Sequence, residues 1–319
     1  MKKAAVIIPN YNGLHYLKPC LNALNAQTDR DFEVCVVDNG SDDGSTEYLE
    51  KEYPSVRIIA FSENTGFCRA VNAGVEASET PYVILLNNDT VPDKDFVREL
   101  VKGLDENADV FSCASCMLTK QDETILDGAG DLYSALGWAF ARGKDKKAAD
   151  YDKQADIFSA CAGAAIYRTE VFKSLGMLDE KHFAYLEDMD LGWRARLHGW
   201  RSIYVPSAKV VHLGSGTTGS RHNDFKVKLS ARNNIYMIRK NMPKWQRIIN
   251  APFLFAGKTI KILYFKRKGL DGAYKEGYKE GKQMEPPAAI REAARAPFKN
   301  VFRIQLELWA NMFKRDFTG

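Results

Sequence analysis

The first 115 residues alternate short apolar runs with longer stretches in which apolar residues recur every three or four positions. The apolar runs predict strands at 4–8, 33–37, 56–61, 82–86 and 110–113. The periodic stretches between them predict helices at 14–26, 42–53, 66–77 and 93–107. Strands that are apolar on both sides and alternate with helices are typical of a parallel sheet covered by helices. The pattern therefore predicts an α/β fold with a mostly parallel, Rossmann-like sheet.

The pattern changes twice further along the chain. Residues 116–155 are rich in Gly, Lys and Asp and lack a period, which predicts an irregular excursion over the carboxyl edge of the sheet. Helices are expected at 168–175 and 188–198, and short strands at 203–205 and 210–211. From residue 221 the pattern is helical, basic and aromatic. We therefore expect a domain at 1–220 and a helical extension at 221–319.

Composition is that of an ordinary globular protein: 319 residues, 45% hydrophobic and 27% charged. The apolar stretch after Met1-Lys2-Lys3 is too short for an export signal, and no run of ~20 apolar residues predicts a spanning helix. Six scattered cysteines favour reduced thiols in a cytoplasmic protein. The alternative, a zinc site at Cys113, Cys116 and Cys161, has no second cysteine pair or suitably spaced His to support it.

Charge is unevenly distributed along the chain. Residues 221–319 carry 22 Lys and Arg against 8 Asp and Glu, a net charge of +14. The first 220 residues carry 23 basic and 33 acidic residues, a net charge of −10. A basic extension on an acidic body predicts an anionic partner for the extension, such as a membrane surface, a phosphorylated lipid or nucleic acid.

Polar residues follow each of the first four predicted strands, where ligands bind in open α/β sheets. In chain order they are Pro9-Asn10-Tyr11-Asn12-Gly13, Asp38-Asn39-Gly40-Ser41, the segment 64–74 from Asn64 to Gly74, and Asn87-Asn88-Asp89-Thr90. A carboxylate there can take ribose hydroxyls, and an aromatic ring such as Tyr11 can stack on a base. Gly66 opening a helix offers N–H groups to an anion, and Arg69 adds a cation for a diphosphate. Asx-Gly turns also follow strands for steric reasons, but four in register indicate a nucleotide site.

A second acidic cluster, Glu187, Asp188 and Asp190, lies at the start of the helix expected at 188–198. Three carboxylates within four positions repel one another, so one can have the raised pKa that suits a general base. Asp190 and Arg194 are four residues apart and are expected to form a structural ion pair. The alternative is that the acids only complement the helix dipole, which explains one acid better than three.

These motifs together resemble the family 2 glycosyltransferases of the GT-A fold, of the bacterial rhamnosyltransferase-like kind. The matching pieces span residues 4 to about 214 and are the runs at 6–13, 36–41, 64–74, 85–90 and 185–194. The resemblance implies a nucleotide-sugar pocket. Its donor-binding residues would be Pro9, Tyr11, Asn12, Asp38, Asn39, Asn64, Gly66, Arg69, Asn87 and Asn88.

The resemblance also implies a divalent metal, Mn²⁺ or Mg²⁺, since Asn87-Asn88-Asp89 stands where the family has its DxD motif. Asp89 is then the direct ligand, and His212, after the strand expected at 210–211, is the second. The alternative for Asp89 is a cap on the following helix, although Pro92 and Asp93 lie closer to that helix. Asn87 in place of an acid puts the strength of metal binding in question.

For the acceptor side, the resemblance implies that Asp188 is the base, that Glu187 contacts the acceptor or sugar, and that Trp193 lines the acceptor site. Tryptophans at such positions more often pack in cores. Arg221 and His222 are candidates for a loop that closes over the phosphates.

The implied function is an inverting, non-processive transfer of a sugar from a UDP- or dTDP-sugar to an acceptor hydroxyl in cell-surface polysaccharide synthesis. Non-processive transfer is expected because the chain has no QxxRW motif. Two alternatives stay open. A sugar-phosphate nucleotidyltransferase would need a cationic Gly-rich loop after the first strand, which is lacking here. A degenerate sugar-binding or scaffold subunit is favoured only by Asn87.

Within the basic extension, residues 248–265 combine aromatic and aliphatic side chains with lysines. This composition is typical of an interfacial amphipathic segment. It predicts docking on an anionic membrane that carries a polyprenyl-linked acceptor, at the inner face of the cell membrane. A helical subdomain packed on the body, or an element of a homodimer, explains it equally well. No nucleic-acid partner is expected.

Overall fold

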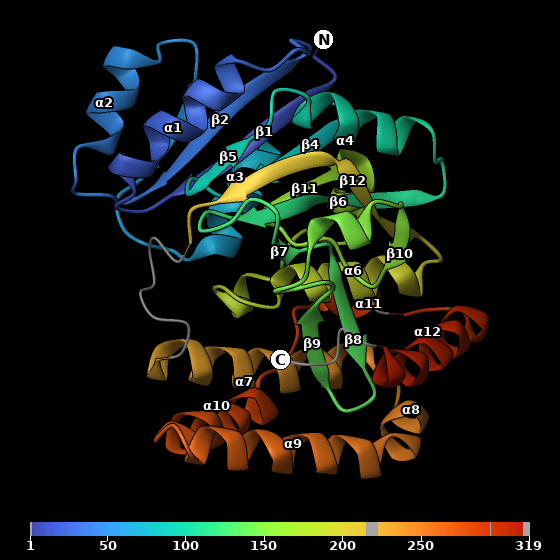
Figure 1. Cartoon of the computed structure of the whole chain (residues 1–319). Coiled ribbons are helices and arrows are strands. Elements are labelled where there is room, and N and C mark those ends of the chain that lie inside the picture. Colours follow the sequence, from blue (N-terminus) through green and yellow to red (C-terminus); the bar gives the residue numbers. More distant parts are fainter. Residues whose placement is uncertain (1, 215–222, 294, 315–319) are drawn as a thin grey trace.

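The computed structural model describes residues 2–214, 223–293 and 295–314 and has a mixed α/β core (Figure 1). The main sheet has the strand order β10-β12-β6-β11-β4-β1-β2-β3, with β5 beside β12 and β7 beside β6. Its strands are β1 (Ala4–Asn10), β2 (Phe32–Asn39), β3 (Arg57–Phe61), β4 (Tyr82–Leu86), β5 (Thr90–Pro92), β6 (Val110–Thr119), β7 (Leu126–Gly128), β10 (Ala155–Ile157), β11 (Ala164–Arg168) and β12 (Arg201–His212). A separate hairpin consists of β8 (Asp131–Ser134) and β9 (Trp138–Ala141).

The central strands are parallel, as the sequence predicts. β1 pairs in parallel with β2 on one side and with β4 on the other, and β2 pairs in parallel with β3. Each of these strands is followed by polar residues, so the polar ends of β1, β2 and β4 meet at one edge. β11 runs antiparallel between β4 and β6, which makes the sheet mixed. The predicted fold class is confirmed.

Helices cover both faces of the sheet because each presents an apolar stripe to it. The helices of this half are α1 (Leu14–Asn25), α2 (Ser45–Glu52), α3 (Phe67–Glu76), α4 (Phe96–Asp105), α5 (Thr169–Ser174) and α6 (Glu187–Leu197). Leu17, Leu21 and Leu24 of α1 pack on one face together with α4, and α3, α5 and α6 pack on the other. The predicted leucine stripe of α1 is therefore the core-facing side of that helix.

Two predicted features differ from the structure. Residues 116–155 are not irregular, since they contain the end of β6, the strands β7 to β9, a 3₁₀ turn at Ala148–Tyr151 and the first residue of β10. The strands expected at 203–205 and 210–211 are one continuous strand, β12. Its pairing with β6 shifts register between Val205 and Lys209, around Pro206. Proline has no N–H to donate to the ladder, and this explains why the sequence pattern breaks there.

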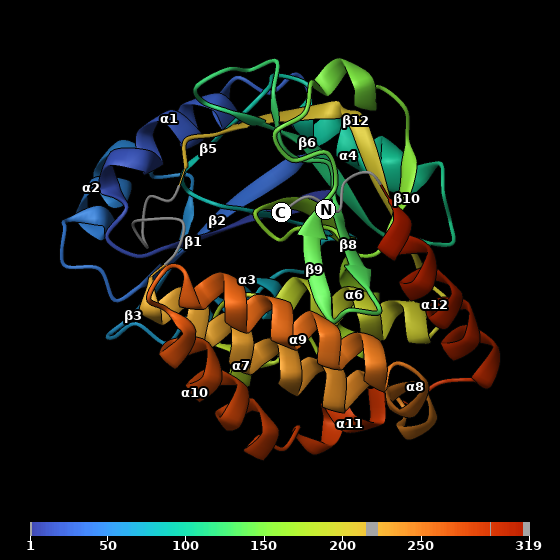
Figure 2. The ribbon, with the colours of Figure 1, turned by 60° about the horizontal axis from the view of Figure 1, so that its bottom comes forward.

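The C-terminal region is helical, as expected, and packs beside α3, α6 and the β8–β9 hairpin (Figure 2). Its helices are α7 (Asp224–Asn241), α8 (Lys244–Ile249), α9 (Ala251–Lys266), α10 (Asp271–Gln283), α11 (Ala288–Ala293) and α12 (Phe298–Ala310). The division expected near residue 220 falls among residues 215–222, outside the described residues. None of the described helices is long and apolar enough to cross a membrane.

Candidate active site

A cavity of about 810 Å³ opens at the carboxyl ends of β1, β2 and β4, where the strand order reverses around β1. Ligands bind at this switch point in open α/β sheets. The start of α6, the end of β12 and the start of α7 complete its wall. Among its lining residues are ten that the sequence predicted: Pro9, Tyr11, Asn39, Asn64, Gly66, Asn87, Asn88, Asp89, Glu187 and Asp188, together with the predicted metal ligand His212.

The donor side of the cavity is held together by Asn39 at the end of β2. Its amide nitrogen donates to the Asn64 side-chain oxygen at 3.0 Å and to the Gly66 carbonyl at 3.2 Å. Its amide oxygen accepts from the N–H and the hydroxyl of Thr65, both at 2.9 Å. These bonds fix the loop before α3, in which Gly66 has a φ of 91°. A side chain at Gly66 would also meet the Phe183 ring, so glycine is required there for two reasons.

Three predicted donor residues lie outside the cavity lining. Asp38 is buried and accepts hydrogen bonds from Asn10 at 2.9 Å and from the Ser41 hydroxyl at 2.7 Å. Asn12 is exposed, and its side chain accepts from the Asp42 N–H at 2.9 Å. Arg69 is exposed, with its guanidinium 5.8 Å from the centre of the Phe61 ring. In this structure Asp38 and Asn12 shape the loops around the cavity, and Arg69 does not line it.

The segment that replaces the DxD motif connects β4 to β5. Asn88 is buried and donates to the Asn10 side chain at 2.7 Å, which ties this segment to the end of β1. The Asn87 N–H donates to the Gly163 carbonyl at 2.9 Å. Asp89 is 7% exposed and is followed at once by β5, so it does not cap a helix; α4 begins only at Phe96. The capping alternative for Asp89 is therefore wrong.

Asp89 lies next to His212, as predicted, although 123 positions separate them along the chain. The His212 Nε2 atom is 3.3 Å from the Asp89 Oδ2 atom. On the other side of the ring, Nδ1 is 2.7 Å from the Oδ2 atom of Asp127, at the centre of β7. Lys144 makes an ion pair with the same Asp127 carboxylate. Asp127 and Lys144 both come from the excursion at 116–155 and were not predicted.

This group suits a divalent cation. Burial lowers the pKa of His212, but its hydrogen bonds to Asp127 and Asp89 outweigh burial and raise that pKa to about 9. At neutral pH the ring is therefore protonated on both nitrogens, and the Nε2 proton faces Asp89, a place that a cation can take. With Asp127 accepting from Nδ1, loss of the Nε2 proton leaves a lone pair that can bind a metal beside the Asp89 oxygen. A carboxylate oxygen and an imidazole nitrogen are ligands that Mn²⁺ accepts.

Asp188 is the second residue of α6 and lies on the cavity wall. Its Oδ2 atom accepts from the Ala162 N–H at 3.0 Å, and its Oδ1 atom accepts from the Met189 N–H at 2.6 Å. Burial raises the pKa of Asp188, and these N–H groups offset only part of the rise. Beside it, burial and the Asp188 charge raise the pKa of Glu187, whose Oε2 atom has no hydrogen-bond partner in the described structure. The acidic cluster thus contains a carboxylate with the raised pKa of a base.

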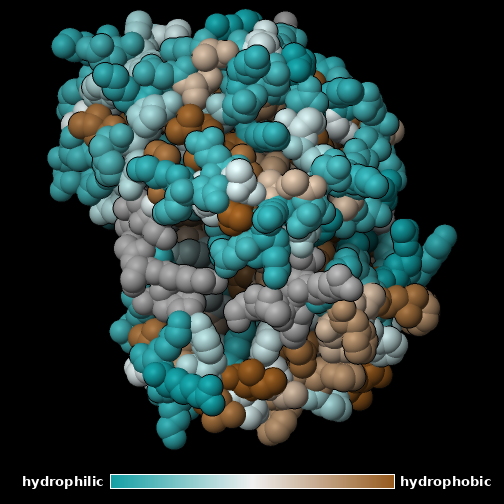
Figure 3. Space-filling model, viewed as in Figure 1, coloured by the Kyte–Doolittle hydropathy of each residue, from teal (hydrophilic) through white to brown (hydrophobic). Residues whose placement is uncertain are grey.

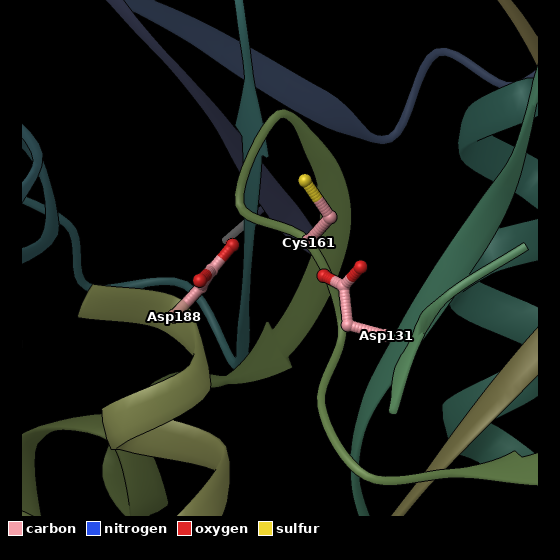
Figure 4. A group of neighbouring side chains, drawn as sticks. All are labelled: Asp131, Cys161 and Asp188. Carbon is pink, nitrogen blue, oxygen red and sulfur yellow. The ribbon is translucent and has the colours of Figure 1, made fainter. Parts of the chain in front are cut away.

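A third carboxylate, Asp131 on β8, faces Asp188 beside the Cys161 thiol (Figure 4). Potential ligand atoms of these three residues lie within 4.8 Å of one another. The trio is a poorer site for a hard cation than Asp89 with His212. Burial raises the pKa of the Cys161 thiol well above its usual value, so the sulfur stays protonated. Both Asp188 oxygens already accept backbone N–H groups. Burial, and then the Asp188 charge, raise the pKa of Asp131, so this pair favours sharing a proton.

The remaining members of the α6 cluster are structural. Asp190 forms the predicted ion pair with Arg194 at 3.0 Å, and both side chains are fully buried. Lys240 of α7 contacts the same carboxylate at 2.9 Å. Trp193 does not line the cavity: it is fully buried against Tyr133 and Phe158. At 100° per residue it lies about 140° around the helix from Asp188, on the core-facing side.

The chain leading into α6 adopts a strained backbone. Phe183, Tyr185 and Leu186 all have φ between 63° and 72°, and all line the cavity. Such conformations persist only where neighbouring structure enforces them. Asn233 of α7 does so here, because its buried amide donates to the carbonyls of residues 182, 184 and 185 at 2.8–2.9 Å. The C-terminal region thereby positions the start of the Asp188 helix.

Several cavity residues had no sequence signal strong enough to identify them. Cys161, Gly163, Phe225 and Lys226 line it without belonging to a motif. The acids Asp127 and Asp131 flank a Gly-Ala-Gly run inside the excursion, and that spacing was the one available signal. Arg221 and His222 lie outside the described residues.

Solved structures of similar fold include two enzymes that the chain covers almost completely. A mannosyltransferase of Pyrobaculum calidifontis in complex with GDP-Man and Mn²⁺ superposes with a TM-score of 0.56 at 16% identity, covering 92% of this chain and 85% of that one. TarS residues 1–349 of S. aureus, in complex with UDP, gives a TM-score of 0.55 at 17% identity, covering 89% and 92%. At these identities the likeness concerns the fold, which is GT-A.

Sequence comparison identifies relatives along most of the chain. An N-acetylglucosaminyl-diphospho-decaprenol L-rhamnosyltransferase of Mycobacterium tuberculosis is 27% identical over 243 residues, 67% of this chain and 77% of that protein. An uncharacterized glycosyltransferase of Rickettsia conorii is 35% identical over 272 residues, 81% of this chain but only 42% of its own length. Residues 5–176 match the family described as Glycosyl transferase family 2. The chain therefore belongs to the family 2 glycosyltransferases.

Proposed function

We propose that this glycosyltransferase inverts the anomeric centre as it moves a sugar from a nucleoside diphosphate donor to an acceptor hydroxyl. The observation that carries the proposal is that Asp188, Asp89 and His212 line one cavity. Its volume of about 810 Å³ lies within the usual range for small-molecule sites, roughly 300–1,000 Å³. A base and a cation site on one cavity are what a direct displacement needs.

On the donor side, the nucleoside can contact Tyr11, Asn39 and Asn64. A phosphate group can accept hydrogen bonds from the N–H groups at the start of α3. Asp89 and His212 would hold a divalent cation, Mn²⁺ or Mg²⁺, which supplies charge stabilisation to the departing diphosphate. Asn87 and Asn88 lie beside Asp89. Because the Asn88 amide is bonded to Asn10, Asn87 is the better candidate for contact with the sugar.

On the acceptor side, the Asp188 carboxylate takes the proton of the acceptor hydroxyl. The hydroxyl oxygen forms a bond to the anomeric carbon while the bond from that carbon to the diphosphate oxygen breaks. The nucleoside diphosphate leaves with the electron pair, and Asp188 ends the step protonated. The raised pKa of Asp188 supports this role, because a base with a pKa nearer to neutral takes a proton more effectively. Glu187 is placed to contact the acceptor or the transferred sugar.

The biological setting follows from the relatives. The mycobacterial relative is named for a decaprenyl-diphosphate-linked acceptor, and another relative is a teichoic acid poly(glycerol phosphate) polymerase of Staphylococcus epidermidis. We infer that the chain acts in cell-surface polysaccharide synthesis on a polyprenyl-linked acceptor, in the cytoplasm at the membrane. Single-sugar addition from a UDP- or dTDP-sugar is the form we favour.

The two alternative functions have less support. The loop after β1 contains no Lys or Arg for a nucleotidyltransferase. A non-catalytic scaffold has no need for a buried carboxylate with raised pKa beside a His–Asp pair on the same cavity.

The test is release of nucleoside diphosphate from a panel of UDP-, dTDP- and GDP-sugars, with and without Mn²⁺, by wild type and by Asp188→Asn. The asparagine keeps the size of the side chain but cannot take a proton. We expect turnover of one donor by wild type, lost by at least 100-fold in Asp188→Asn with donor affinity retained. Equal turnover by both proteins would refute the role of Asp188. Incorporation of the nucleotide into a sugar phosphate would identify a nucleotidyltransferase.

A further inference from the structure

The outer side of the C-terminal helices is apolar, although these helices carry much of the positive charge of the chain. Helix α9 contains eight aliphatic or aromatic residues larger than alanine, yet its one buried residue is Gly257. The exposed fractions of six large apolar side chains lie between 46% and 70%. They are Phe255, Ile260 and Leu263 of α9 and Phe298, Phe302 and Leu306 of α12, which together we call the apolar face.

The apolar residues of α12 form a stripe, and the start of α9 lies against that helix. Phe298, Phe302 and Leu306 recur every four residues, so they form a single stripe along α12. The start of α9 is fixed to α12 because the Asn250 and Gln305 side chains bond each other at 2.7 Å and 2.9 Å. Figure 3 shows brown apolar residues gathered along the lower side of the molecule, where Figure 1 places these helices. Exposed large apolar side chains gathered on one side of a protein mark an interaction site.

Basic residues predominate around the apolar face, and the nearest acids of α10, Asp271 and Glu276, are ion-paired with Lys275 and Lys228. Residues 243–270 contain seven Lys and Arg and no Asp or Glu. At the end of α9, Lys266, Arg267 and Lys268 are all exposed. Along α12 the single acid is Glu307, and it is ion-paired with Arg196 of α6. The partner of this face is therefore apolar in part and anionic at its edge.

A second copy of the chain does not fit that description. In a two-fold dimer the same patch forms both sides of the interface. Here that arrangement would bring basic residues against basic residues, which is unfavourable. An anionic bilayer offers an apolar interior to the phenylalanines and phosphate groups to the lysines. Helices with this division of residues lie in the membrane interface with their apolar side inserted.

We propose that the apolar face, with the basic residues at 266–268, is the surface by which this protein binds an anionic lipid bilayer. The purpose of the contact, access to a lipid-linked acceptor, rests on the proposed function; the contact itself does not. Helix α7 lines the cavity through Phe225 and Lys226 and packs on α10, so the helical region that binds lipid also borders the active site.

The test is flotation of the full chain with vesicles of phosphatidylcholine and phosphatidylglycerol at 70:30, or of phosphatidylcholine alone, in low salt. No donor or acceptor is added. We expect binding to the anionic vesicles and at least tenfold weaker binding to the neutral ones. Ile260→Ser with Leu263→Ser should weaken binding at least tenfold, since both side chains lose their place in the interface.

Replacing Lys266, Arg267 and Lys268 by Gln should weaken binding on the order of 100-fold, at roughly fivefold per charge removed near the surface. The matched control replaces three exposed lysines of the other half, Lys18, Lys94 and Lys102, by Gln. Unchanged melting temperatures establish that each variant is folded. The control should bind as wild type does.

Three results would overturn the proposal: wild type that never floats with anionic vesicles, a control as impaired as the 266–268 variant, or a dimer that Ile260→Ser with Leu263→Ser converts to monomer. Failure here is distinguishable from failure of the proposed function. A protein that transfers sugar to a soluble acceptor but never floats overturns the membrane surface alone. A protein that floats but turns over no nucleotide sugar overturns the proposed function alone.

Discussion

The Asp127 carboxylate accepts from Nδ1 of His212 and thereby presents Nε2 to the cation site, so its removal should weaken metal binding. The bond is 2.7 Å long, and its partner ring is only about one-fifth exposed. Loss of such a partner typically lowers metal affinity 10- to 100-fold, or about 1.4–2.7 kcal/mol. Asp127→Ala should also have an opposite, strengthening effect on metal affinity, because Asp127 helps to raise the pKa of His212 to about 9.

That proton competes with the metal. In wild type, affinity for Mn²⁺ should therefore rise roughly tenfold for each pH unit between 7 and 8.5. In Asp127→Ala the pKa of His212 is lower, so the slope should be shallower. At pH 8.5, proton competition in wild type is only about fourfold, and the variant should bind Mn²⁺ roughly 2- to 20-fold more weakly.

The assay is calorimetric titration of Mn²⁺ into protein saturated with UDP, from pH 7 to 8.5. Asp127→Asn should fall between wild type and the alanine variant, since an amide oxygen still accepts from Nδ1 without the charge. Asp150→Ala removes an exposed acid of the same excursion and serves as the control. Wild-type affinity and slope in Asp127→Ala, beside lost affinity in His212→Ala, would show that Asp127 does not orient the ring. Unchanged affinity in both variants would remove His212 from the metal site.

Three further outcomes are expected. Because the pKa of Asp188 is raised and the base acts ionised, kcat/KM should fall on the acid side at a higher pH than an ordinary aspartate would give; a fall only at the ordinary pKa of an aspartate would contradict the assignment. Without metal, protonated His212 contributes to the free energy of unfolding because its pKa is raised in the folded protein. That contribution is fully present below pH ~6.5, and at most about 3 kcal/mol of it should be lost as the pH rises to about 9. Urea unfolding of wild type and His212→Gln measures that loss, which the variant should lack. Asn233→Ala should cost about 2–4 kcal/mol of stability and raise the acceptor KM, since its amide holds the strained carbonyls before Asp188. An unchanged acceptor KM in a folded Asn233→Ala protein would show that these hydrogen bonds do not position the active site.

The strands and their polar ends were predictable because the information is local. β1, β2, β3 and β4 are short apolar runs, and each run is followed by its own polar motif. The rule that parallel strands end at one edge then brings Asn39, Asn87 and Asp89 to one cavity without any knowledge of contacts. The spacing of four residues between Asp190 and Arg194 was equally sufficient for their ion pair.

The rest of the site depends on long-range packing that no local pattern encodes. Asp127 of β7 lies next to His212 of β12 only because both strands pair with β6. Asn233 reaches the strained segment from a helix of the C-terminal region. Trp193 and Arg69 belong to segments that carry functional motifs, but neither side chain lines the cavity. For a residue on a helix, proximity in sequence to a motif did not predict that its side chain lines the cavity.

The central claim is that a cation held by Asp89 and His212 shares one cavity with the Asp188 base. The most direct test is the position of Mn²⁺ in crystals grown with MnCl₂ and UDP, read from its anomalous scattering. We predict one peak within about 2.0–2.2 Å of an Asp89 oxygen and of His212 Nε2, with the diphosphate beside it. A peak at the Asp131, Cys161 and Asp188 trio, with none at Asp89, would contradict the account, because Asp188 would then be a metal ligand and not a base.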